Sequence, residues 1–208
     1  MRVDQRGLEH NAVRLGGTVS RGSHNLVWID MEMSGLDPLT CMPLEIATIV
    51  TNSELDILAE GPNLVIHQPD EVLDAMDAWN TEHHGKSGLT EAVKQSRMSC
   101  AEAESMTLAF LERWTEPGRS PLCGNSIGQD RRFLRRYMPA LNQHLHYRVI
   151  DISSVKELAW RWYRLQPPRK NEAHRALGDI HESIEELRFY RRTIFADEIS
   201  FMDPPPGS

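Results

Sequence analysis

The stretch LVWIDMEMSGL, from Leu26 to Leu36, constrains the fold of this chain more than any other stretch. Its first half is apolar and rich in residues that favour β-structure, which is typical of a buried strand. It then runs directly into two carboxylates, Asp30 and Glu32. Side chains two apart on a strand share a face, so these carboxylates should lie close together and raise each other's pKa. A fold that keeps them together needs a cation between them.

The segments that follow alternate between strand-like and helix-like patterns. Residues 44–51 and 56–68 predict a second and a third strand, joined by the hairpin-like turn NSEL. Further strands are expected at 121–125 and 147–151, and helices at 70–79, 99–114, 127–138, 153–163 and 176–195. The helix from 99 begins with a capping box, Ser99 with Glu102. Antiparallel strands followed by alternating strands and helices predict an α/β fold, a mixed five-stranded sheet flanked by helices.

The composition is that of an ordinary globular protein. The 208 residues are enough for one domain with a sizeable core, and no apolar run approaches the roughly 20 residues of a membrane span. Three scattered cysteines without a CxxC pair indicate reduced thiols and an intracellular protein. The net charge of −7 argues against a broad basic face, so a nucleic-acid partner should be short or gripped locally.

Domain boundaries follow from composition at the two ends. Residues 1–23 lack periodic apolar patterning and are expected to form a flexible leader or a presequence. Residues 197–208, which contain DPPPGS, are expected to form a flexible tail. The segment 24–196 between them is expected to be a single domain.

Two further acids lie beside residues expected in the core. Asp130 follows the strand at 121–125 on a helix whose apolar positions include Phe133 and Leu134. Asp179 borders an apolar stripe that includes Ile180. Unpaired carboxylates near a core are costly, whereas carboxylate oxygens suit Mg²⁺ or Mn²⁺. Together with the acids of the first strand, they predict a paired-metal site for phosphodiester cleavage. Its divalent ions would be the cations that the two carboxylates of the first strand require.

Simpler interpretations of these residues remain open. Asp30 and Glu32 alone could be exposed carboxylates at a strand end, and His174 could be a surface residue on the charged loop before the last helix. Beside four acids, His174 could instead take a proton from an attacking water, because its pKa lies near working pH. The arginines of RRFLRR (131–136) are expected on the solvated face of an amphipathic helix rather than in a nucleic-acid patch.

Four ordered segments, WIDMEMSGL, CGNSIGQDRRFL, HYRVIDISSVKEL and HRALGDI, resemble the oligoribonuclease family. This family belongs to the DEDDh class of 3′–5′ exonucleases, which have a ribonuclease H-like fold. The resemblance covers about residues 25–195, so it implies an exonuclease domain at 24–196. It implies two Mg²⁺ or Mn²⁺ ions held by the four acids, Asp30, Glu32, Asp130 and Asp179, with His174 as the general base.

The same resemblance implies the substrate contacts. Leu36 matches a residue that wedges against a base, and Trp79 and His84 match residues around the 3′ nucleotide. Ser126 matches a contact to the 5′ phosphate. Tyr147, Arg148 and Ser153 match groups supplied by the partner subunit of a homodimer with shared active sites. From the residues alone, Trp79 could equally be core and Arg148 a solvated edge charge. Gly178 stands where many members of the family have a second aspartate.

The function implied is a homodimeric, metal-dependent 3′–5′ exoribonuclease. It would degrade very short RNA, especially dinucleotides, to nucleoside 5′-monophosphates. One alternative keeps the fold but trims longer RNA or DNA ends, and another is a non-catalytic RNA-binding or scaffold protein. The segments AEGPNLVIHQPDE and EHHGKSGLT look like those of animal-type members, which favours cytoplasm and mitochondria as locations.

Overall fold

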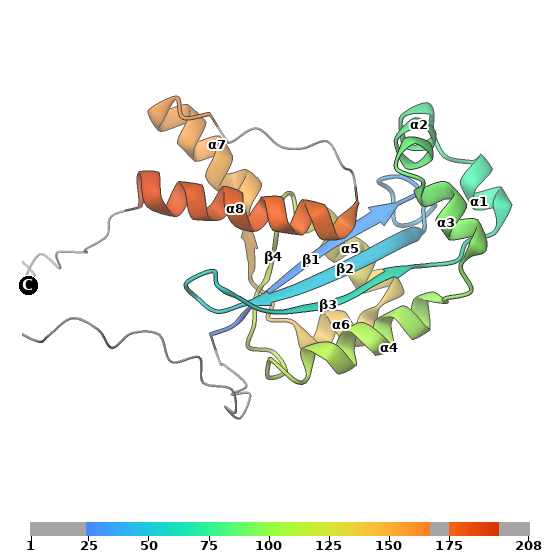
Figure 1. Ribbon diagram of the computed structural model, residues 1–208, viewed down its shortest axis with the longest axis horizontal. Helices are drawn as coiled ribbons and strands as arrows, with labels where there is room; N and C mark the ends of the chain where they lie inside the picture. Colours follow the sequence, from blue (N-terminus) through green and yellow to red (C-terminus); the bar gives the residue numbers. More distant parts are fainter. Residues whose placement is uncertain (1–23, 167–174, 196–208) are drawn as a thin grey trace, which may run out of the picture.

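The computed structural model describes residues 24–166 and 175–195. They form a five-stranded sheet with helices on both faces (Figure 1). The strands are β1 (Leu26–Met33), β2 (Pro43–Thr51), β3 (Ile57–Val65), β4 (Leu122–Gly124) and β5 (Val149–Asp151). Their order is β3-β2-β1-β4-β5. The first three strands pair antiparallel, whereas β4 pairs parallel to both β1 and β5. The predicted mixed α/β sheet is therefore confirmed.

The helices form two layers and a cap. Their bounds are α1 (Asp70–Asp74), α2 (Ala78–Lys86), α3 (Leu89–Gln95), α4 (Cys100–Leu111), α5 (Gly128–Tyr137), α6 (Pro139–His144), α7 (Ile152–Tyr163) and α8 (Ala176–Ile194). The last two cover one face of the sheet and α4 to α6 the other, while α1 to α3 gather at the end where β1 finishes (Figure 1). Among the described residues, no helix has the length and apolarity that crossing a membrane requires.

Side chains of β1 point alternately to the two faces of the sheet, and this alternation decides which face carries the acids. Val27 and Ile29 pack into the cluster beneath α4 to α6, whereas Trp28 packs beneath α7 and α8. Because residues two apart share a face, Asp30 and Glu32 follow Trp28 onto the face that α8 covers. Unlike the purely apolar positions before them, both are only partly buried. The strand therefore carries its two carboxylates to the rim of the sheet beside α8.

Several helix boundaries differ from the prediction. The single helical region expected at 70–79 is two helices, because Asp77 is extended and its side chain accepts the Asn80 amide at 2.8 Å, which starts α2. Neither α3 nor α6 was predicted. The predicted capping box of α4 is confirmed, with Ser99 and Glu102 each accepting the other's backbone N–H.

The prediction for the arginine run was wrong at Arg131. Its side chain is buried, and its guanidinium donates to the carbonyl of His146 at 2.8 Å. Arg131 lies four residues after Ile127 and three before Leu134, so it occupies the apolar stripe of α5. The other three arginines of the run are exposed, as predicted.

Candidate active site

Three carboxylates meet where β1 passes under the first turn of α8. Carboxylate oxygens of Asp30, Glu32 and Asp179 lie within 4.8 Å of one another. The first two come from alternate positions of β1, and Asp179 is the fourth residue of α8. The structure thus brings together acids that are about 150 positions apart in the sequence. Such a group of oxygen donors can hold a hard divalent cation.

Asp130 reaches the same region from the neighbouring edge of β1. β4 pairs with β1 at Val27 and Trp28, and no strand of residues 24–166 or 175–195 pairs with the later part of β1 on that side. The helix after β4 fills this place, and a carboxylate oxygen of Asp130 accepts the Met31 amide at 3.0 Å. A Cβ at Gly124 would lie 3.2 Å from the Ile29 carbonyl, so glycine permits this close approach.

The electrostatics of the cluster fit a cation. Burial raises the pKa of Glu32 to about 8, and the charges of Asp30 and Asp179 add to the rise. Burial also raises the pKa of Asp130 well above its usual range, with a further contribution from Asp30. These carboxylates repel one another and lack full hydration, so divalent cations with oxygen-rich coordination would relieve both costs.

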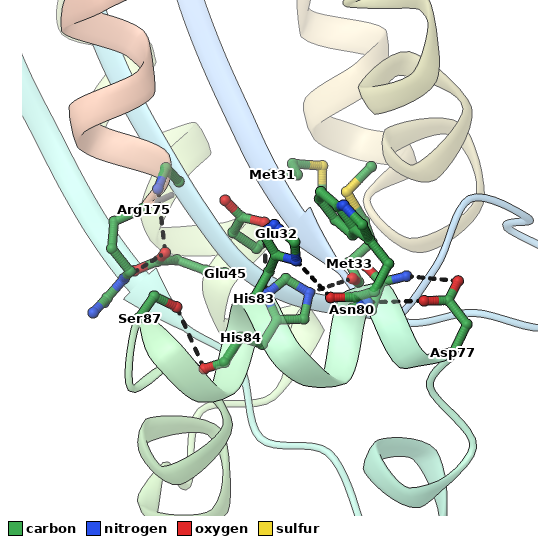
Figure 2. Close-up of polar contacts among 12 residues, drawn as sticks. Met31, Glu32, Met33, Glu45, Asp77, Asn80, His83, His84, Ser87 and Arg175 are labelled. Carbon is green, nitrogen blue, oxygen red and sulfur yellow. Dashed lines mark hydrogen bonds and ion pairs between the residues drawn. The ribbon is translucent and has the colours of Figure 1, made fainter. Parts of the chain in front are cut away.

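Glu45 and Arg175 form an ion pair beside this cluster that sequence reasoning missed. Glu45 is fully buried on β2, directly opposite Glu32, and Arg175 donates to both of its carboxylate oxygens at 3.0 and 3.1 Å (Figure 2). The available signal was one carboxylate inside the otherwise apolar strand LEIATIV. A buried acid in such a strand requires a partner, but the sequence does not say which cation supplies it.

The two aromatic residues expected around a nucleotide occupy different environments on α2. Trp79 is 59% exposed and stacks on His83 with ring centroids 3.8 Å apart, so it is not a core residue. His84 is buried, which lowers its pKa. Its Nε2 lies 2.9 Å from the Met33 carbonyl, which requires a proton on Nε2, and its Nδ1 lies 3.9 Å from Glu32 (Figure 2). His84 therefore contacts the acid cluster directly.

Leu36 sits in the loop after β1 with its backbone anchored and its side chain 73% exposed. Its carbonyl accepts a hydrogen bond from Gln129 and a longer one, 3.4 Å, from Arg132. The hydroxyl of Tyr137 holds the other side of the loop by donating to the Cys41 carbonyl at 2.8 Å. All three anchors belong to α5, the helix that also carries Asp130. A single helix thus fixes both an acid of the cluster and an exposed apolar side chain.

The residues expected near a 5′ phosphate form a second group at the ends of β4 and β5. Ser126, with φ of 51°, donates its backbone N–H to Asp151 and to Ser153 at 3.1 and 3.0 Å. The two serine hydroxyls lie 3.1 Å apart within this one chain. Tyr147 is 72% exposed, and the Arg148 guanidinium lies 5.4 Å from the centre of its ring. His174 lies outside the described residues.

Comparison with known proteins gives one family and many relatives. The exonuclease family RNase_T matches residues 27–187. An oligoribonuclease of Dichelobacter nodosus is 57% identical over 174 residues, 84% of this chain and 97% of that protein. The human mitochondrial oligoribonuclease is 51% identical over 194 residues, 90% of this chain and 82% of that protein. Similarity to bacterial members is therefore at least as high as similarity to an animal member.

Solved structures agree on the fold. Exonuclease I of E. coli in complex with a 5cy-dT13 oligonucleotide superposes with a TM-score of 0.62 at 17% identity. The match covers 82% of this chain but only 41% of the exonuclease I chain. At that identity the likeness concerns the fold alone, a ribonuclease H-like sheet flanked by helices.

Proposed function

Because the chain belongs to the oligoribonuclease family, we propose that its four clustered acids hold two divalent metal ions for the cleavage of short RNA. The chain is a 3′–5′ exoribonuclease acting on short oligoribonucleotides. The observation that supports the metal centre best is the approach of Asp30, Glu32 and Asp179 to within 4.8 Å. Mg²⁺ or Mn²⁺ suits these oxygen donors.

In the proposed reaction, the acids would hold the metal ions and a histidine would act as the general base. Bound ions would stabilise the attacking and leaving oxygens of the phosphodiester. Asp130 is held in place by the Met31 amide, and Glu32 lies against His84, so both acids are oriented before any ion arrives. We assign the general base to His174, which directly precedes Arg175, the residue fastened to Glu45. A neutral imidazole there would take the proton of the attacking water.

We propose that the substrate is held mainly by its bases and its 5′ end. Leu36 and Trp79 are large apolar side chains that remain exposed, as expected of surfaces that contact bases. Ser126 and Ser153 are hydrogen-bonded to each other in one chain, so a phosphate that binds both would take them from the same subunit. Together with Arg148 supplied by the second subunit of a homodimer, they would close the site on a 5′ phosphate and favour dinucleotides.

We also propose that the active species is a homodimer. β5 is an edge strand, and large apolar side chains are exposed on it, just before it and on the following helix α7. These residues are Tyr147, Val149, Trp160, Trp162 and Tyr163. Exposed apolar side chains along an open sheet edge are typical of a protein interface. Tyr147 and Arg148 would then reach the partner's site.

For location we propose cytoplasm and mitochondria. The proposal is supported by the 51% identity to a human mitochondrial oligoribonuclease. Fractionation of the source cells, with detection of the full-length chain in each fraction, tests it. Absence from mitochondrial fractions would leave the cytoplasm alone.

A product-length time course tests the proposed activity. RNAs of two, three, five and ten nucleotides, labelled at the 5′ end, are incubated with the protein in Mg²⁺ and in excess chelator. We expect release of nucleoside 5′-monophosphates only with Mg²⁺, fastest on 5′-phosphorylated dinucleotides. Equal rates on two and ten nucleotides would favour an exonuclease of longer ends, and absence of cleavage at every length would favour a binding protein.

A further inference from the structure

We propose that Glu45 holds the Arg175 guanidinium away from Glu32, which keeps the carboxylates of the site available to metal ions. The inference rests on the proposed metal centre. It assigns to Glu45 a positioning role, since no substrate or reacting atom needs to touch it. In this proposal, the Arg175 guanidinium and a divalent metal ion compete for the carboxylate of Glu32.

The geometry begins with the register of β1 and β2. Glu32 and Glu45 are direct partners across the antiparallel pair, so their side chains lie on the same face of the sheet. Asp30, two residues earlier on β1, shares this face. Three acids therefore project from adjacent positions of two strands toward the start of α8. Arg175, which immediately precedes that helix, approaches the same group.

Only one of these acids binds the arginine tightly. Glu45 is fully buried and accepts hydrogen bonds from two nitrogens of Arg175 (Figure 2). It also accepts the Ala176 amide at 3.3 Å. Such two-oxygen pairing uses the guanidinium fork fully. Glu32 is the cross-strand partner of Glu45, so the guanidinium bound to Glu45 lies beside the acids proposed to bind metal ions.

Removing the carboxylate of Glu45 would release this cation beside Glu32. Arginine has a long side chain and cannot lose its proton in a protein, so it would seek the nearest carboxylate. An oxygen of Glu32 that pairs with the guanidinium is less available to a metal ion. The fold would then contain an internal competitor for its own metal site.

A different role for the pair must be separated from this one. Glu45 and Arg175 also fasten the start of α8, because the Arg175 carbonyl accepts the Asp179 amide at 3.1 Å and Ala176 donates to Glu45. If fastening is the whole role, loss of either partner misplaces Asp179, and loss of both is at least as harmful. If Glu45 acts against competition, loss of both partners removes the competitor as well.

Mn²⁺ affinity, measured by calorimetry on the full chain at one pH, distinguishes these roles. We expect Glu45→Gln to weaken Mn²⁺ binding by about 10- to 100-fold, the range usual for partners of metal ligands. The double variant Glu45→Gln, Arg175→Gln should bind Mn²⁺ within about 3-fold of the wild type. Glu157→Gln, which breaks the exposed Arg161 pair on α7, is the matched control and should bind normally.

The outcomes are separable. A double variant that binds Mn²⁺ as weakly as Glu45→Gln, or more weakly, would overturn the inference, and so would a Glu45→Gln protein that binds like the wild type. If Glu45→Gln does not fold, the double variant compared with the wild type still decides, because a loss of 10-fold or more contradicts the competitor role. Failure of the wild type itself to bind Mn²⁺ would instead count against the proposed metal centre.

Discussion

At the level of single residues, the fold supports the acids of the site in different ways. Asp130 is almost fully buried and accepts a backbone amide, whereas Glu32 is partly exposed and contacts His84. An asparagine at position 130 could keep the hydrogen bond from Met31 while losing the charge. Substitution there therefore separates the role of the carboxylate in catalysis from its role in the fold.

Asp130→Asn should abolish most cleavage while leaving the fold intact. Loss of outer partners of metal ligands costs about 10- to 100-fold, so loss of a direct ligand should cost more than about 100-fold in kcat. Without metal the variant should be more stable than the wild type, because a buried, repelled carboxylate is replaced by a neutral amide. Steady-state rates and thermal melts check both. Asp74→Asn, at an exposed position of α1, is the control.

Stability without metal should depend on pH through Glu32. Its pKa rises from 4.5 to about 8 on folding, so the folded state binds more protons than the unfolded state between these values. The contribution of Glu32 to the free energy of unfolding should therefore be greatest below pH 4.5 and should fall as the pH rises to about 8. Mg²⁺ should restore it, increasingly so at higher pH.

Denaturant unfolding between pH 5 and pH 8, with chelator or with Mg²⁺, measures this dependence. Glu32→Gln should flatten the decline and reduce the stabilisation by Mg²⁺. A wild-type protein whose metal-free stability depends on pH just as that of Glu32→Gln does would show that Glu32 ionises as easily in the folded state as in the unfolded chain.

At the level of elements, the first turn of α8 carries Asp179 yet contains Gly178. Among the described residues, no atom outside the backbone of its own helix lies within 4 Å of a Cβ placed there, so none of these residues requires glycine. Gly178→Ala should raise the free energy of unfolding by about 0.5–1 kcal/mol, because alanine is the better helix former. Gly124→Ala should do the opposite, since its Cβ would lie 2.8 Å from Ile127. Urea unfolding of both variants tests the contrast.

The strands and the long helices could be predicted because their patterns are local. The hairpin at 52–55 and the capping box at Ser99 depend on neighbouring residues, and both are present. Short α6 was missed because its sequence lacks a periodic pattern, and its Pro139 serves as a helix start after the break at Met138. Arg131 was misplaced because the hydrogen bond that permits its burial comes from distant His146.

In the candidate site, too, features that depend on local patterns could be predicted and contacts between distant residues could not. The acids could be proposed from the sequence because each stands beside apolar positions or a strand end. The partner of Glu45 could not, because Arg175 lies 130 residues away and approaches only when α8 packs on the sheet. The buried setting of His84 was missed for the same reason, since its contact with the Met33 carbonyl spans 51 residues.

At the level of the whole molecule, shared sites would make activity a property of the dimer. Asp130→Asn chains and Arg148→Ala chains should each be poorly active alone. A heterodimer of the two would contain one site with both residues intact, so mixing them should restore about half of the wild-type activity per heterodimer. Each variant mixed with itself is the control. Verified heterodimers without recovered activity would mean that Arg148 acts within its own subunit.

The most direct measurement of the metal centre is anomalous diffraction at the manganese edge. Crystals would be soaked with Mn²⁺ and a dinucleotide that has a non-hydrolysable linkage. We expect two manganese peaks bonded to carboxylate oxygens of Asp30, Glu32, Asp130 and Asp179, with the linkage phosphate between them. A bound dinucleotide with no manganese on these four carboxylates would contradict the assignment of the cluster as a two-metal nuclease site.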